Sequence, residues 1–169
     1  MTSHHRFRNG VVYSLAALLA LALLATAGAA TAGHVRVATA VSGSWAATGG
    51  DIVEQRQLGS ATYLRQLGSS SFQGDLVGAT TFDLRLVLRA DFSSFGWATE
   101  AFQGRLGGRS GTLSMLERVT GGVDGSVRID AVVLDGTGEL RNVRGTITFV
   151  SPLCIPETCE GTYSGLLVG

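Results

Sequence analysis

The sequence has few of the residues on which common enzymes and nucleic-acid-binding proteins depend. None of its 169 residues is lysine, and its 13 basic residues are arginines that mostly stand alone along the chain. Nucleic-acid binding needs a basic surface, so this distribution excludes a nucleic acid partner. Beyond the N-terminal segment the chain holds one histidine, His34. Hydrolytic triads need a histidine base inside the fold, and that class is therefore also excluded.

Cysteine and proline are equally scarce, with two residues of each. Cys154 and Cys159 enclose a short segment that contains Pro156, and Pro152 comes just before it. An exported protein meets oxidising conditions, so the sequence predicts a disulfide between the two cysteines. Metal binding is the weaker alternative, because a zinc site needs about four ligands and His34 is the only histidine left to help. We expect no metal and no other cofactor.

Long apolar runs are absent except at the N-terminus. Residues 11–25 form an almost wholly apolar stretch of 15, preceded by Arg6 and Arg8 and followed by small residues as far as Ala32. A basic start, a short apolar core and small residues are typical of a secretory signal peptide. A membrane anchor is the alternative, but a membrane-spanning helix needs about 20 apolar residues. If the segment stayed uncleaved, it would be the chain's only contact with a membrane.

The expected cleavage site divides the chain into two parts. The small-residue patterns that end at Ala29 and Ala32 both suit cleavage. We therefore assign residues 1–32 to a signal peptide and residues 33–169 to a single domain of ordinary size. The protein is expected to be secreted.

The domain carries the alternating pattern of β-strands and no convincing helical period. Apolar and polar residues alternate over residues 82–89, 123–133 and 143–149, as expected for strands with one buried face. The expected strands are residues 36–46, 51–58, 61–74, 78–90, 95–105, 109–118, 122–134 and 144–150, with 161–168 as a ninth candidate. Short connections favour an antiparallel meander, and closure into a barrel removes its exposed edges. We therefore predict an all-β, eight-stranded closed barrel, with a β-sandwich as the second choice.

Glycine is abundant, and one glycine-rich stretch is partly repeated. Residues 102–111 read FQGRLGGRSG, and residues 72–78 read FQGDLVG. A phosphate-binding loop would need a lysine and a following helix, and this stretch has neither. Glycine pairs supply the positive φ of tight hairpin turns. The sequence therefore predicts a hairpin at Gly107-Gly108, with Gly104 and Gly111 marking bends in the flanking strands.

These same residues resemble a known family. The stretch EAFQGRLGGRSGTL at 100–113 resembles the E-x-F-x-G-x-L-G-G-R-S-G-S-F core of the bacterial family catalogued as domain of unknown function 3224. GTGELRNVRG at 136–145 is similar to its G-T-G-E-L-x-G-L-R-G motif, and residues 72–78 match its F-x-G-D-I-x-G strand pair. The resemblance covers residues 37–168. The family is similar to the allene oxide cyclase barrel, so the resemblance implies an eight-stranded antiparallel barrel and no established activity. The motif residues that we expect to shape the barrel are Phe72, Gly74, Phe102, Gly104, Gly107, Gly108, Gly111, Gly138, Glu139, Arg144 and Gly145.

Glu100 is the most informative polar residue. Alternation over residues 95–105 does not decide whether its side chain points inward, because both faces of this strand carry apolar residues. An inward carboxyl would have a raised pKa unless an arginine paired with it, and Arg109 and Arg144 are candidate partners. We favour a structural ion pair over a functional acid in the barrel mouth. Glu139 is a second candidate partner for Arg109.

A ligand site in the barrel mouth is the functional hypothesis that these residues support. Glu100, Arg109, Trp97 and Tyr63 are its candidate members. The favoured function is binding of a small apolar or amphipathic molecule. The alternatives are an isomerase or cyclase that acts in the same cavity, and a filled barrel that serves as a structural or interaction module. Paired carboxylates for glycoside hydrolysis also stay open, because Glu117 and Glu139 accompany Glu100 without a spacing that singles them out.

Overall fold

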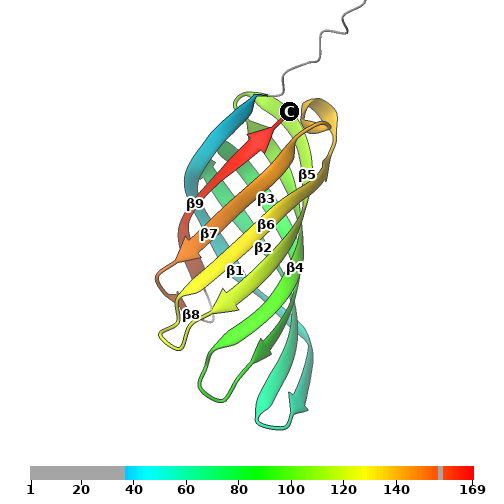
Figure 1. Cartoon of the computed structure of the whole chain (residues 1–169). Coiled ribbons are helices and arrows are strands. Elements are labelled where there is room, and N and C mark those ends of the chain that lie inside the picture. The colour runs from blue at the N-terminus through cyan, green and yellow to red at the C-terminus, as the bar shows by residue number, and fades with distance from the viewer. Residues whose placement is uncertain (1–36, 156–157) are drawn as a thin grey trace, which may run out of the picture. The chain divides into compact units, whose positions relative to one another are not determined.

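The computed structural model describes residues 37–155 and 158–169, and the strands in this part of the chain form one antiparallel sheet (Figure 1). The predicted signal peptide, residues 1–32, lies outside the described residues. The elements in chain order are β1 (Ala38–Leu58), β2 (Ala61–Gly74), β3 (Leu76–Leu88), β4 (Ser94–Leu106), β5 (Arg109–Gly121), β6 (Val127–Gly136), the 3-10 turn η1 (Gly138–Leu140), β7 (Arg144–Ser151), β8 (Cys154–Ile155) and β9 (Thr158–Val168).

The sheet closes on itself, and we call the result the barrel. Each strand from β1 to β7 pairs with the next along the chain, β7 pairs with β9, and β9 returns to β1. Within the described residues this ring has eight strands, and the short β8 pairs with β9 alone. The predicted all-β antiparallel fold is confirmed, and the ninth candidate strand is the one that closes the ring.

The predicted strand boundaries are wrong in two places. The segments 36–46 and 51–58 belong to one strand, β1, because Gly49 and Gly50 form an irregularity in its pairing with β2 and do not reverse the chain. Beyond Thr48, β1 pairs with β2 alone, since its register with β9 ends there. The segment predicted at 122–134 becomes a strand only at Val127.

One end of the barrel is filled by side chains. Phe72, Phe102 and Phe149 meet there edge to face, with ring centroids 5.8 Å apart for Phe72–Phe102 and 5.7 Å apart for Phe72–Phe149. Such tilted pairs are favoured by the aromatic quadrupole. Leu140, at the end of η1, is fully buried against this cluster. The packed end is the one that carries the C-terminus in Figure 1.

The repeated glycine motif forms the hairpins of this packed end. β4 ends at Leu106 and β5 begins at Arg109, so Gly107 and Gly108 make the turn that the sequence predicts. Their φ angles are +55° and +86°, a conformation that side chains disfavour. Gly74 has a φ of +112° and begins the corresponding turn between β2 and β3. The barrel is thus tightly closed at one end, which leaves its other half to hold a site.

Candidate functional site

A cavity of about 600 Å³ occupies the half of the barrel opposite the packed end. This volume is in the range of pockets that bind small molecules. Its walls are largely apolar, and its floor meets the aromatic cluster at Phe72 and Phe149. The apolar side chains that form its walls include Leu84, Leu86, Leu88, Val119 and Ile129.

Strand periodicity places these side chains inside the barrel. Leu84, Leu86 and Leu88 are alternate residues of β3, and alternate residues of a strand point to the same face. Val119 of β5 and Ile129 of β6 are register partners, so their side chains lie on the same face of the sheet and both border the cavity. The alternation that the sequence displays therefore supplies the apolar lining.

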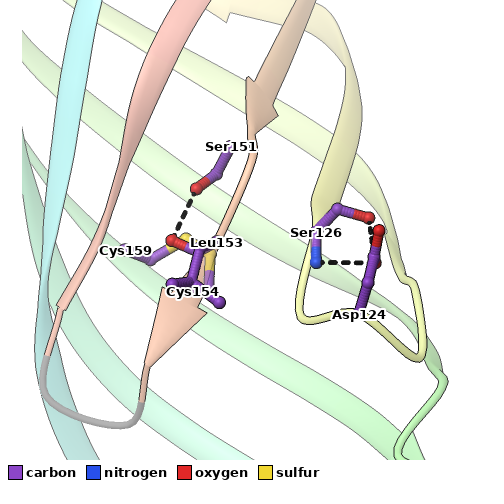
Figure 2. The surroundings of a disulfide bond; sticks show 6 residues. All are labelled: Asp124, Ser126, Ser151, Leu153, Cys154 and Cys159. Atoms are coloured by element: carbon purple, nitrogen blue, oxygen red, sulfur yellow. Dashed lines mark hydrogen bonds between the residues drawn. A yellow bond between two sulfur atoms is a disulfide. The ribbon is translucent and has the colours of Figure 1, made fainter.

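The predicted disulfide is present at the rim of the cavity (Figure 2). It joins Cys154 of β8 to Cys159 of β9, which are register partners. The Cys154 amide donates a 2.8 Å hydrogen bond to the Gly125 carbonyl in the β5–β6 loop. In that loop the Asp124 carboxylate accepts hydrogen bonds from the Ser126 amide at 3.0 Å and the Ser126 hydroxyl at 2.7 Å. These contacts hold two rim segments together.

Two glutamates from neighbouring strands point into the cavity. Glu100 of β4 and Glu117 of β5 have exposed fractions of only 6% and 5%. Glu100 pairs with Met115 and Ala98 pairs with Glu117, so the two glutamates lie diagonally across the ladder. The Thr80 hydroxyl of β3 donates a hydrogen bond to Oε1 of Glu100. Oε1 of Glu117 has no hydrogen-bond partner among the described residues.

The surroundings of Glu117 favour its neutral form. Burial is the largest cause, and it raises the pKa of Glu117 together with repulsion from Glu100 and a hydrogen bond between the two side chains. The pKa rises to about 10. Glu117 therefore keeps a proton at neutral pH and can donate it in a hydrogen bond to Glu100, as close carboxyl pairs do. The pair offers a hydrogen-bond donor and an acceptor side by side.

Two of the predicted site residues lie elsewhere. Trp97 is 48% exposed on the outside of the barrel, because it stands three positions from Glu100 on the same strand and so faces the other way. Tyr63 is not among the residues that line the cavity, and the Arg56 guanidinium lies 4.8 Å from its ring centre. The expectation that these aromatic side chains line the barrel mouth is therefore corrected.

The expected ion pair of Glu100 is also absent from the described residues. Arg144 pairs instead with Asp135, at 3.0 Å. Arg109 borders a smaller pocket, of about 190 Å³, at the packed end. Glu139 accepts a 2.7 Å hydrogen bond from the Ser110 amide. The partners of Glu100 are Thr80 and Glu117, since no arginine borders the cavity within the described part of the chain.

Three residues in the cavity wall or next to it were not singled out by the sequence as members of a ligand site. Thr80 and Glu117 surround Glu100, and Trp45 has an indole nitrogen that is buried without a hydrogen-bond partner among the described residues. A signal for Glu117 does exist, because it continues the row of inward residues Met115 and Val119 along β5. Thr80 has a comparable position in β3, but only the folded ladder shows which carboxyl it meets.

Metal binding finds no support in residues 37–155 and 158–169, where no three histidine, cysteine or acidic side chains gather as a ligand set. In the same residues, none of the helical segments has the length and apolar character to span a membrane.

Comparisons with known proteins agree with the fold. The model of a family described as a protein of unknown function, DUF3224, matches residues 51–152. A crystal structure of a DUF3224 protein of unknown function from Shewanella oneidensis is similar, with a TM-score of 0.63 and 19% identity. The match covers 78% of this chain and 97% of that one. No curated protein matches this chain. The likeness to the allene oxide cyclase barrel stays a prediction.

Proposed function

The chain belongs to the DUF3224 family, and we propose that it binds a small apolar or amphipathic molecule in the cavity of its barrel. The cavity carries this proposal. It measures about 600 Å³, it is lined mainly by apolar side chains, and a few polar groups converge in it. This combination is typical of small-molecule sites.

The contrast between the two halves of the barrel supports a binding role over a purely structural one. An eight-stranded barrel is wide enough to be filled by side chains or to hold one small ligand. At the packed end, large side chains such as Phe102 and Leu113 fill the interior. At the other end, Leu84 and Leu86 border open space. Apolar walls around open space favour an apolar occupant.

We further propose that the protein acts outside the cytoplasm. The Cys154–Cys159 disulfide supports this location, because disulfides persist in oxidising compartments. The ligand would then be an exported or environmental molecule. Cell fractionation with an antibody against the protein tests this proposal, and recovery of the protein solely from the cytoplasm would contradict it.

Binding of a neutral apolar fluorophore tests the main proposal. N-phenyl-1-naphthylamine is uncharged at neutral pH and brightens when it leaves water. The purified protein should raise its emission saturably. Leu86→Trp puts a larger side chain into the cavity and should weaken binding at least about ten-fold. Val87→Trp is the matched control, because the next residue of β3 faces the other side of the sheet and its replacement should leave binding unchanged.

A non-saturable signal, or equal binding by the two variants, would contradict binding in the cavity. Circular dichroism of both variants verifies that the barrel is retained.

An isomerase is the second candidate, and the Glu100–Glu117 pair favours it. A protonated Glu117 can polarise a carbonyl group while Glu100 takes a proton from the α-carbon and returns it to the γ-carbon, which shifts the double bond into conjugation. The test is incubation with 3-cyclohexenone, whose conjugated isomer absorbs in the ultraviolet. Catalysis should be lost in Glu100→Gln. No acceleration over buffer would leave binding as the sole proposed function.

A further inference from the structure

We propose that Glu100 and Glu117 form a subsite for the protonated amine of an otherwise apolar ligand. This inference rests on the proposed binding function and specifies its ligand class. It starts from the charges that line the cavity. The ionisable side chains of known placement there are Glu100, Glu117 and Asp124, and among the described residues no arginine or histidine borders the cavity.

The acidic side chains that line the cavity disfavour anionic ligands. A carboxylate or phosphate ligand would enter an apolar space whose charged groups are all acidic, and like charges repel strongly where water is excluded. Asp124 stands in the β5–β6 loop at the rim, and the glutamates lie deeper, on β4 and β5. A cation therefore meets acidic groups from the rim to the buried pair.

A buried atom without a partner marks the position of the ligand's polar end. Oε1 of Glu117 belongs to a side chain that is 5% exposed, and it has no hydrogen-bond partner in the described structure. Buried polar atoms are costly unless they are hydrogen bonded. An ammonium group has three donors, so one ligand group can supply hydrogen bonds to Glu117 and to Glu100.

The residues around the pair require an apolar body next to the amine. Phe82 of β3 is the register partner of Glu100, and Ala98 of β4 is the register partner of Glu117. Both line the cavity, as does Val119, two positions along β5 from Glu117. A hydrated inorganic cation would leave these apolar walls facing its water shell. An amine on a hydrocarbon frame satisfies both the walls and the pair.

Three probes with one hydrocarbon cage test the inference. Isothermal titration calorimetry at pH 7 compares 1-adamantanamine, 1-adamantanol and adamantane-1-carboxylate, which differ in the head group alone. The amine should bind at least about ten-fold more tightly than the alcohol, as expected for hydrogen bonds between charged groups. The carboxylate should bind more weakly than the alcohol.

Removing both carboxyls should remove the preference. In the Glu100→Gln/Glu117→Gln variant, amine and alcohol should bind within about two-fold of each other, because both amides are neutral and still form hydrogen bonds. Glu160→Gln is the control, since Glu160 is an exposed carboxyl of β9 outside the cavity, and it should keep the full preference. Thermal melting verifies that each variant is folded.

The outcomes separate this inference from the function on which it rests. Equal binding of amine and alcohol by the native protein would overturn the amine subsite and leave apolar binding intact. A preference that survives in the double glutamine variant would also overturn it. Failure of all three probes and of N-phenyl-1-naphthylamine would instead overturn the proposed binding function.

Discussion

Glu117 lies diagonally across the β4–β5 ladder from Glu100, and both carboxyls are buried in the same cavity. Neighbouring strands thus bring together two acidic side chains, although like charges on neighbouring strands would be destabilising. The arrangement persists because Glu117 is neutral at ordinary pH and can be hydrogen bonded to Glu100. Stability and ligand choice should both depend on this shared proton.

The first prediction concerns pH. Burial and Glu100 raise the pKa of Glu117 from 4.5 to about 10, so the folded protein binds a proton that the unfolded chain has released. Stability from this group is fully present below pH 4.5 and is lost as pH rises toward 10. Glu117→Gln stays neutral throughout. Relative to this variant, the native protein should lose up to about 1.4 kcal/mol of unfolding free energy per pH unit between pH 5 and 9.

Urea denaturation of both proteins at pH 5, 7 and 9 measures this difference. Glu160→Gln, which removes an exposed carboxyl, should track the native protein. Glu100 and Asp124 are the other acidic groups that line the cavity. Because Glu100 contributes to the raised pKa of Glu117, the Glu100→Gln variant should show a smaller pH dependence of stability than the native protein. If the unfolding free energies of Glu117→Gln and the native protein differed by the same amount at all three pH values, Glu117 would be ionised in the folded protein.

The second prediction concerns the hydroxyl that supports Glu100. Thr80→Val keeps the shape of the side chain and removes the donor to the buried carboxyl. Removing one partner of a buried hydrogen bond costs about 1–3 kcal/mol, so the unfolding free energy should fall by about 2 kcal/mol. Thr81→Val is the control, because Thr81 is exposed on the other face of β3. Equal losses from the two substitutions would contradict a special role for Thr80.

Much of the fold follows from local patterns in the sequence. Alternation, glycine turns and the paired cysteines each predict a feature that the structure contains, because each depends on residues close together in the chain. The segment Thr48–Asp51 shows the limit of such reasoning. Its glycines suit a turn, yet β2 runs unbroken beside it and holds β1 as one strand. Pairing with a continuous neighbour overrides the local signal.

The site is less predictable, because its geometry depends on which strands become neighbours. The strand around Glu100 has apolar residues on both faces, including an exposed Trp97, so alternation there is ambiguous. The row Leu113, Met115 and Val119 is clearer and would have placed Glu117 inside. Only the register of β4 and β5 shows that the inward carboxyls meet each other, and no arginine of residues 37–155 and 158–169 borders the cavity beside them.

The third prediction separates two reasons for glycine in the repeated motif. At Gly107 a Cβ atom would meet nothing within 4 Å, so Gly107→Ala should be destabilised only by the strain of a side chain at a φ of +55°, about 1 kcal/mol. At Gly104 a Cβ atom would collide with the Val77 carbonyl oxygen and lie 2.7 Å from the Phe102 ring. Gly104→Ala should therefore lose more, about 3 kcal/mol.

Chemical denaturation at one pH measures both glycine variants against the native protein. Equal losses of unfolding free energy in the Gly104 and Gly107 variants would show that the close approach of the strands is not the reason for glycine at position 104 of β4.

The last prediction concerns the disulfide at the cavity rim. Cys154 and Cys159 are five positions apart, and linking them restricts the unfolded chain. For a loop of this size the chain-entropy relation gives about 2 kcal/mol, so the Cys154→Ser/Cys159→Ser variant should be less stable by that amount. Adding a reductant should lower the melting temperature of the native protein toward that of the variant and leave the variant unchanged. The Cys154 amide is hydrogen bonded to Gly125, so loosening this hairpin should also weaken N-phenyl-1-naphthylamine binding at the rim. If the variant lost stability but still bound the fluorophore as tightly as the native protein, the disulfide would stabilise the fold without contributing to ligand binding.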